Sequence, residues 1–202
     1  MLEIFKETYY YLDLLIGFSS PFLFYFLYKT GRIEKFVWHF FWIGVLVGTT
    51  WEIPIFVLSG EFTSIPIITW VRPLIAHYRV FMISHSLWDG LIFVIGIWLV
   101  YRICRKPLFQ HFRWSEMLVF LVWGQASELL VELSSTLNDG WVFIQYWWNP
   151  VIFQFNGHNI TWLMQIVWAA ASIGYYVVLI KLKPKLTKSV RVQPHKLDIH
   201  DF

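Results

Sequence analysis

Five long apolar segments, separated by short clusters of charged residues, dominate this chain of 202 residues. Each segment has roughly 18 to 24 residues, the length that an α-helix needs to cross the hydrocarbon core of a bilayer. Charged residues make up 14% of the chain, against roughly a quarter in a typical soluble domain. We therefore predict an all-α polytopic membrane protein, a bundle of about five transmembrane helices. The spans are expected at about 9–28, 36–58, 80–101, 114–137 and 160–182.

The length predicts one transmembrane domain, residues 1–182, followed by a basic cytoplasmic tail at 183–202. The N-terminus has no basic stretch followed by an apolar core and a cleavage site, so no cleaved signal peptide is expected. Residues 60–79 are apolar but broken by Pro66 and Pro73, which predicts a re-entrant or interfacial segment rather than a span. Residues 138–159 are expected to form a long loop rich in Trp and Asn.

The distribution of Lys and Arg predicts the orientation. Thirteen of the sixteen lie in the first connection, the third connection and the C-terminal segment, which five alternating spans place on one side. The positive-inside rule then predicts a cytoplasmic C-terminus and a lumenal or external N-terminus. Several tryptophans, among them Trp147, Trp148 and Trp162, fall near predicted membrane interfaces, as expected of an aromatic belt.

Polar side chains occur inside all five predicted spans, where ionisable groups are costly and often functional. With the predicted orientation, they all fall in the non-cytoplasmic half of the bilayer. At about 1.5 Å of rise per residue, they occupy a layer roughly 10 Å thick. The members of this polar layer are Asp13, Glu52, His85, Asp89, Gln125, Glu128, Glu132 and Gln165.

Helical spacing predicts that these groups converge, because residues three, four or seven positions apart share one helix face. His85 and Asp89 are four apart and are expected to act as a pair. For Asp13 and Glu132, a place at the membrane interface is an alternative to a role in a site. Acids among aromatic rings could serve as acids or bases, or attract a cation. We predict catalytic roles for Glu52, His85, Asp89 and Glu128, and ligand contacts from Trp51, Trp88, Gln125, Glu132, Gln165 and Trp168.

Four pieces of sequence between Phe36 and Trp168 carry a family resemblance. The first piece is WEIPIF, which contains Glu52, and the second is LWDG, which ends at Gly90. The third is Gly124-Gln125, followed by Asp139-Gly140-Trp141, in which Asp139 lies fourteen residues after Gln125. The fourth is Pro150 before a helix that contains Gln165 and Trp168. This arrangement resembles the EXPERA superfamily, which includes the emopamil-binding sterol isomerases and the sigma-2 receptor. The resemblance implies a polar pocket among the helices, a sterol-like ligand and an endoplasmic reticulum membrane.

The resemblance also implies a reaction, in which a sterol double bond is moved by protonation at one carbon and deprotonation at another. Glu52 or Glu128 would donate, His85 paired with Asp89 would relay, and Trp168 would face the cation. The family's sterol isomerases carry His four residues before the acid of the second span, where this chain has Gly48. That departure favours a non-catalytic protein that binds a lipid or a cationic amphiphile.

Other classes remain open at this stage. An accessory subunit of a membrane complex would use the same polar stripes against partner helices, and a homodimer is one assembly available to such a chain. A transporter is disfavoured because the acids occupy one leaflet and the chain has no internal repeat. No cofactor, metal or nucleic-acid partner is expected. A metal on His85, Asp89, Glu128 and Glu132 is a disfavoured alternative, and haem with two histidine ligands is disfavoured because only His85 lies clearly inside a span.

Overall fold

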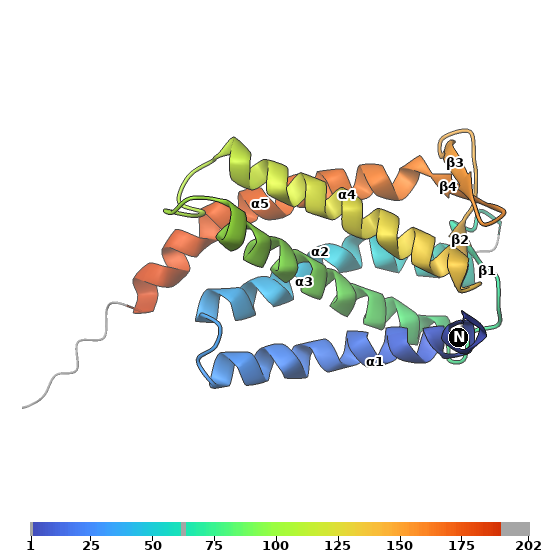
Figure 1. Cartoon of the computed structure of the whole chain (residues 1–202), viewed down its shortest axis with the longest axis horizontal. Coiled ribbons are helices and arrows are strands. Elements are labelled where there is room, and N and C mark those ends of the chain that lie inside the picture. The colour runs from blue at the N-terminus through green and yellow to red at the C-terminus, as the bar shows by residue number, and fades with distance from the viewer. Residues whose placement is uncertain (1, 62–63, 191–202) are drawn as a thin grey trace, which may run out of the picture.

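Five long helices make up most of the protein in a computed structural model that describes residues 2–61 and 64–190. They run alternately up and down one common axis (Figure 1). Within the described residues, all five are long and apolar enough to cross a membrane, which confirms the predicted all-α bundle and makes this an integral membrane protein. The helices are α1 (Leu2–Lys29), α2 (Lys35–Gly60), α3 (Tyr78–Ile103), α4 (Trp114–Leu137) and α5 (Trp162–Val190).

Two of these helices extend well beyond their predicted spans. α1 begins at Leu2 instead of near residue 9, and α5 continues to Val190 instead of stopping near residue 182. The first part of the predicted tail is therefore helical, because a helix that leaves the hydrocarbon layer can continue with polar residues. Residues 191–202, which include the predicted tail residues Arg191 and Lys196, lie outside the described residues.

Short β-strands occupy the end of the bundle opposite the α1–α2 and α3–α4 connections (Figure 1). β1 (Ile68–Trp70) pairs antiparallel with β2 (Trp141–Phe143), and β3 (Val151–Phe155) pairs antiparallel with β4 (His158–Thr161). The expectation of a plain loop at 138–159 was wrong, because β pairing satisfies the backbone polar groups of a segment rich in aromatic and β-branched residues. Residues 60–79, as expected, contain no helix of membrane-spanning length within their described part.

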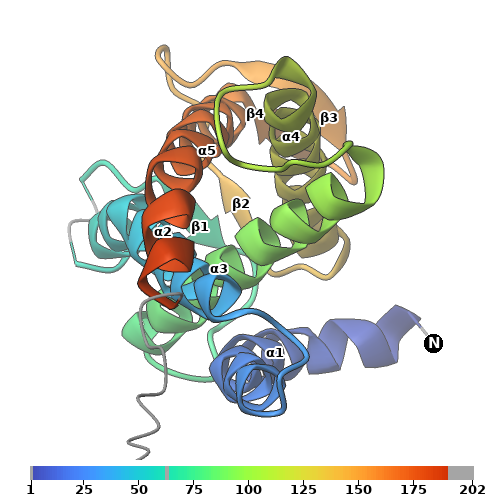
Figure 2. The same cartoon turned by 90° about the vertical axis from the view of Figure 1, so that its left-hand side faces the viewer.

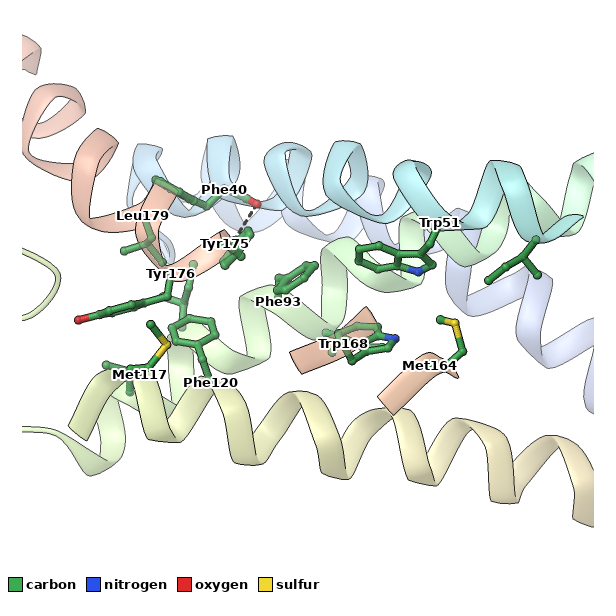
Figure 3. Close-up of a cluster of buried hydrophobic side chains, with 14 of the residues drawn as sticks. Phe40, Trp51, Phe93, Met117, Phe120, Met164, Trp168, Tyr175, Tyr176 and Leu179 are labelled. Carbon is green, nitrogen blue, oxygen red and sulfur yellow. Dashed lines mark hydrogen bonds between the residues drawn. The ribbon is translucent and has the colours of Figure 1, made fainter. Parts of the chain in front are cut away.

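α3 lies at the centre of the bundle and α1 at its edge (Figure 2). In their most apolar stretches, 61% of residues are buried in α3 and 22% in α1. Between α2, α3 and α5, the core is a column of aromatic rings (Figure 3). Phe93 stacks on Tyr175 at 4.2 Å between ring centroids, and the Tyr175 hydroxyl donates to the Phe40 carbonyl at 2.9 Å.

The strand end is fastened to the start of α1 by polar contacts. The Tyr10 hydroxyl donates to the Gly140 carbonyl at 2.7 Å, and Lys6 forms an ion pair with Asp139 at 2.7 Å. The Arg72 guanidinium donates to the carbonyls of Asp139 and Lys6. These contacts close the strand end of the bundle over the space between the helices.

Candidate functional site

A cavity of about 520 Å³ lies near the strand end of the bundle, with walls from all five helices. The end wall of the cavity is formed by Ile68 of β1 and by Trp141 and Phe143 of β2. The polar contacts between the start of α1 and the strand end, here called the cap, lie at the same end of the bundle. Its volume falls in the range of roughly 300–1,000 Å³ that is usual for small-molecule sites. Most of the lining is apolar or aromatic, and the lining acids and histidine are Asp13, Glu52, His85, Asp89 and Glu128.

Asp13 fixes α1 against α3 on one side of this cavity. Its carbonyl oxygen accepts from the Ser84 hydroxyl at 3.2 Å and from the Trp88 indole at 3.0 Å. The helices can approach closely here because α1 has Gly17 one turn further on, where a Cβ would overlap the Ser84 side chain. The Asp13 carboxylate is therefore held at the cavity wall.

His85 bridges two acids from different helices. Its Nε2 lies 2.9 Å from Oδ2 of Asp13, and its Nδ1 lies 3.7 Å from Oε2 of Glu52. Its ring also meets Phe56 edge-on, at 5.1 Å between centroids. The predicted pairing with Asp89 was wrong. A four-residue spacing puts both residues on one face of α3, but the imidazole reaches outward to α1 and α2 instead of along its own helix.

Asp89 and Glu128 are buried in the cavity wall with 4% and 3% of their surfaces exposed. Oδ2 of Asp89 and Oε1 of Glu128 accept no hydrogen bond from any of the described residues. The Asp89 carboxyl lies against Gly48 of α2, where any Cβ would overlap it. Buried polar atoms usually find partners, so two cavity-lining acids with a free oxygen each are candidates for contact with a ligand.

Aromatic rings complete the wall beside these acids. Trp168 of α5 lines the cavity, and its ring lies 5.5 Å from Trp51 and 5.4 Å from Phe93 (Figure 3). Trp51 packs behind Trp168 and is not part of the lining. Trp88 lines the cavity while its indole N–H is engaged by Asp13.

The structure thus divides the ten predicted site residues into two groups. Six line the cavity: Glu52, His85, Trp88, Asp89, Glu128 and Trp168. The remaining four are Trp51, Gln125, Glu132 and Gln165, and three of these connect α4 to α5 and β4. Gln125 donates to the Gln165 carbonyl at 2.9 Å, and Glu132 accepts from the Thr161 backbone N–H at 3.3 Å.

Asp13 lines the cavity but was not among the predicted site residues. Its position along the chain put it in the predicted polar layer, but its place early in a span made the membrane interface the favoured explanation. The signal that favours the cavity is Gly17 one turn later, since a small residue on the same face permits close packing of α1 on α3.

The cavity reaches the outer surface of the bundle between α1 and α4. Leu12 and Ile16 of α1 and Leu130 of α4 line it and are also exposed, Leu130 to 61%. Both helices pack on α3, and the cavity occupies the space between them. In a membrane, this side of the bundle faces lipid, so the opening is suited to a molecule that arrives from the bilayer.

No protein-family model, curated protein or solved structure was found to match this chain. The fold and the cavity therefore define the class of this protein, an integral membrane protein with a mostly apolar pocket that contains several acidic side chains inside a five-helix bundle.

Proposed function

We propose that this chain is a pocket protein of the EXPERA type, which takes a sterol-like lipid from the bilayer and moves one of its double bonds. The observation that carries the proposal is the cavity itself, which is apolar over most of its wall, lined by four carboxyl groups and one imidazole, and open between α1 and α4. A rigid, mostly apolar ligand suits such a wall, and the acids supply what an alkene isomerisation needs.

The reaction is redox-neutral and requires only proton transfer. Glu128, as the carboxylic acid, gives its proton to one alkene carbon, and the alkene electron pair becomes the new C–H bond. A carbocation forms at the neighbouring carbon, and the ring of Trp168 and the carboxylate of Glu52 stabilise it. Asp89, as the carboxylate, then removes a proton from the carbon on the other side of the cation, and that C–H electron pair becomes the new double bond.

Between turnovers, Asp89 loses the proton it has taken up to water and Glu128 takes up a new one from water, once the product has left the cavity. His85 contacts Asp13 and Glu52 rather than either of these acids, so its role is to hold the two carboxylates in the cavity wall. This replaces the relay expected from the sequence, in which Asp89 was its partner. Asp89 instead supplies the base.

A second candidate function is binding without chemistry. Both ring nitrogens of His85 face carboxylates, and Gly48 stands where the family's isomerases carry a histidine. A pocket with an excess of acids would hold a cationic amphiphile by charge attraction and by contact with aromatic rings.

Turnover in heavy water distinguishes the two candidates. Purified protein in lipid nanodiscs receives a sterol with a ring double bond, and mass spectrometry follows its conversion. Isomerisation places one deuterium in the product, and we expect Glu128→Gln to lower the rate by about 100-fold or more. Glu7→Gln, an exposed acid on α1, is the matched control and keeps the rate of the unchanged protein.

Conversion at the normal rate by Glu128→Gln contradicts the catalytic assignment. Sterol that co-purifies with the unchanged protein and is never converted supports the binding protein instead. Absence of both bound sterol and turnover contradicts the proposal as a whole.

We also propose residence in the endoplasmic reticulum membrane, with the C-terminus cytoplasmic and the N-terminus lumenal. The support for the orientation is the excess of Lys and Arg at the end of the bundle opposite the strands, and residence in the endoplasmic reticulum follows from the resemblance to the EXPERA superfamily. Glycosylation acceptor sites added at each terminus test the orientation, since only a lumenal site acquires a glycan.

A further inference from the structure

The connection between α4 and α5 differs in composition from every other connection. From Trp141 to Thr161 it contains no Asp, Glu, Lys or Arg, and the first charged residue after it is Lys181. Asp139 at its start, which pairs with Lys6, is the one charged residue of this connection, whereas each of the other three connections carries several, for example Arg32, Arg72 and Arg105. A connection of this length in water would be expected to carry charged residues at something near the rate of a soluble surface.

The exposed tip of this connection is held rigidly. The Tyr146 hydroxyl donates to the Pro66 carbonyl at 2.8 Å, and the Tyr146 ring stacks on Trp148 at 5.0 Å. The buried Asn149 side chain donates to the Ile144 carbonyl at 2.9 Å and accepts from the Leu163 N–H at 2.8 Å. The turn that these contacts fix presents Trp147 with 93% of its surface exposed.

The apolar surface around this turn continues onto the lipid-facing sides of the neighbouring helices. The β3–β4 hairpin lies beside the ends of α4 and α5 (Figure 1). Large apolar side chains are exposed along this path, and they are Leu137 of α4, Trp147, Trp148, Ile152 and Phe153 of the connection, and Trp162 and Ile166 of α5. The exposed polar side chains among them, Gln145, Gln154 and Asn156, are uncharged.

From these observations we infer that the segment from Tyr146 to Phe155, the turn and strand β3, lies in the interfacial layer of the bilayer, with Trp147 as its anchor. The partner is the boundary between lipid headgroups and acyl chains. An indole is suited to it, because it combines a large apolar ring with one N–H donor. Backbone groups of the segment pair in the β3–β4 hairpin, which lowers the cost of leaving water. This inference is independent of what the cavity binds.

Site-directed spin labelling tests it in reconstituted vesicles of phosphatidylcholine. The native cysteine is first removed as Cys104→Ser, and a nitroxide is attached at Trp147→Cys or, as a second position on the same surface, at Phe153→Cys. Gln110→Cys, exposed in the α3–α4 connection at the opposite end, is the aqueous control. Collision rates are measured with oxygen, which concentrates in lipid, and with a neutral water-soluble nickel complex.

We expect the ratio of oxygen to nickel collision rates at positions 147 and 153 to exceed that at position 110 by about fivefold or more, since hydrocarbon enriches oxygen and excludes the complex. A ratio at 147 and 153 equal to that at 110 places the segment in water and overturns the inference. Protection of both positions from both reagents means that protein covers them, and this also overturns it. Because Trp147 is almost fully exposed, its replacement is not expected to disturb folding, and Phe153 provides an independent reading.

Discussion

Buried carboxyl groups at the two ends of the bundle differ in how their oxygens are hydrogen-bonded. At the end with the α3–α4 connection, Glu116 is fully buried and its oxygens are occupied. They accept from the Phe109 N–H at 3.2 Å and from the Tyr176 hydroxyl at 3.1 Å, and Arg113 lies at 3.4 Å. At the strand end, Asp89 and Glu128 are almost as buried, yet each keeps an oxygen that accepts no hydrogen bond from the described residues.

This difference separates an acid that holds the fold together from acids that are available to a ligand. Glu116 joins α4 to α5 and to the preceding connection, so its burial is balanced by the bonds it accepts. Asp89 and Glu128 border a cavity, and Oδ2 of Asp89 and Oε1 of Glu128 form no hydrogen bond with the described residues. Burial alone would not have distinguished the two kinds of acid.

The largest expected effect on stability comes from Glu116. Glu116→Ala leaves the Phe109 N–H without its acceptor and the Tyr176 hydroxyl with the Arg113 carbonyl alone, and should lower the free energy of unfolding by about 3 kcal/mol. Glu128→Ala should cost much less, because it breaks no hydrogen bond at Oε1. Chemical unfolding in detergent micelles measures both variants. Equal losses would remove the distinction between the two ends.

A change at Gly48 tests whether the strand end is packed around Asp89. Gly48→Ala introduces a Cβ that overlaps the Asp89 carboxyl, and overpacking of this kind costs about 1–3 kcal/mol. Gly174→Ala is the matched control, because nothing lies within 4 Å of a Cβ there. It should stabilise α5 by up to about 1 kcal/mol through helix propensity. Thermal unfolding of both variants measures the two effects. If Gly48→Ala stabilises the protein, the Asp89 carboxyl is not packed tightly against Gly48.

Asp13→Asn tests the bridge at His85. The amide keeps a hydrogen-bonding group but removes the charge next to the imidazole, so we expect a loss of about 1–2 kcal/mol and weaker binding of the lipid. Glu7→Gln removes a charge from the exposed side of the same helix and should change neither quantity. Unfolding and lipid titration are measured together, and identical behaviour of the two variants would contradict the placement of Asp13 in the site.

The smallest expected effect is at the cap. Asp139→Asn breaks the ion pair with Lys6, but both side chains are partly exposed, so the loss should not exceed about 1 kcal/mol. Asn also tolerates the positive φ of 51° at this position. The same unfolding assay applies, and a loss greater than that of Asp13→Asn would show that the cap, more than the bridge, fixes α1.

Several features of this protein were predictable from the sequence because they depend on distance along the chain. The spans follow from the lengths of apolar segments, and the polar layer follows from counting residues along helices that alternate in direction. Glu52, His85, Asp89 and Glu128 were placed at one level in this way, and the structure places all four at one cavity. Helical rise is nearly constant, so depth in the membrane can be read from residue number.

Only the tertiary structure decided which of these groups meet. Lateral neighbours depend on the rotation of each helix about its axis and on how closely the helices pack, which a single sequence does not specify. His85 therefore contacts Asp13 and Glu52 instead of Asp89. The Asp89 carboxyl occupies the space left by the missing side chain of Gly48. Gln125, Glu132 and Gln165 lie between α4 and its neighbours α5 and β4 rather than along the cavity wall. Depth is set by the local geometry of one helix, whereas a site is set by contacts among several.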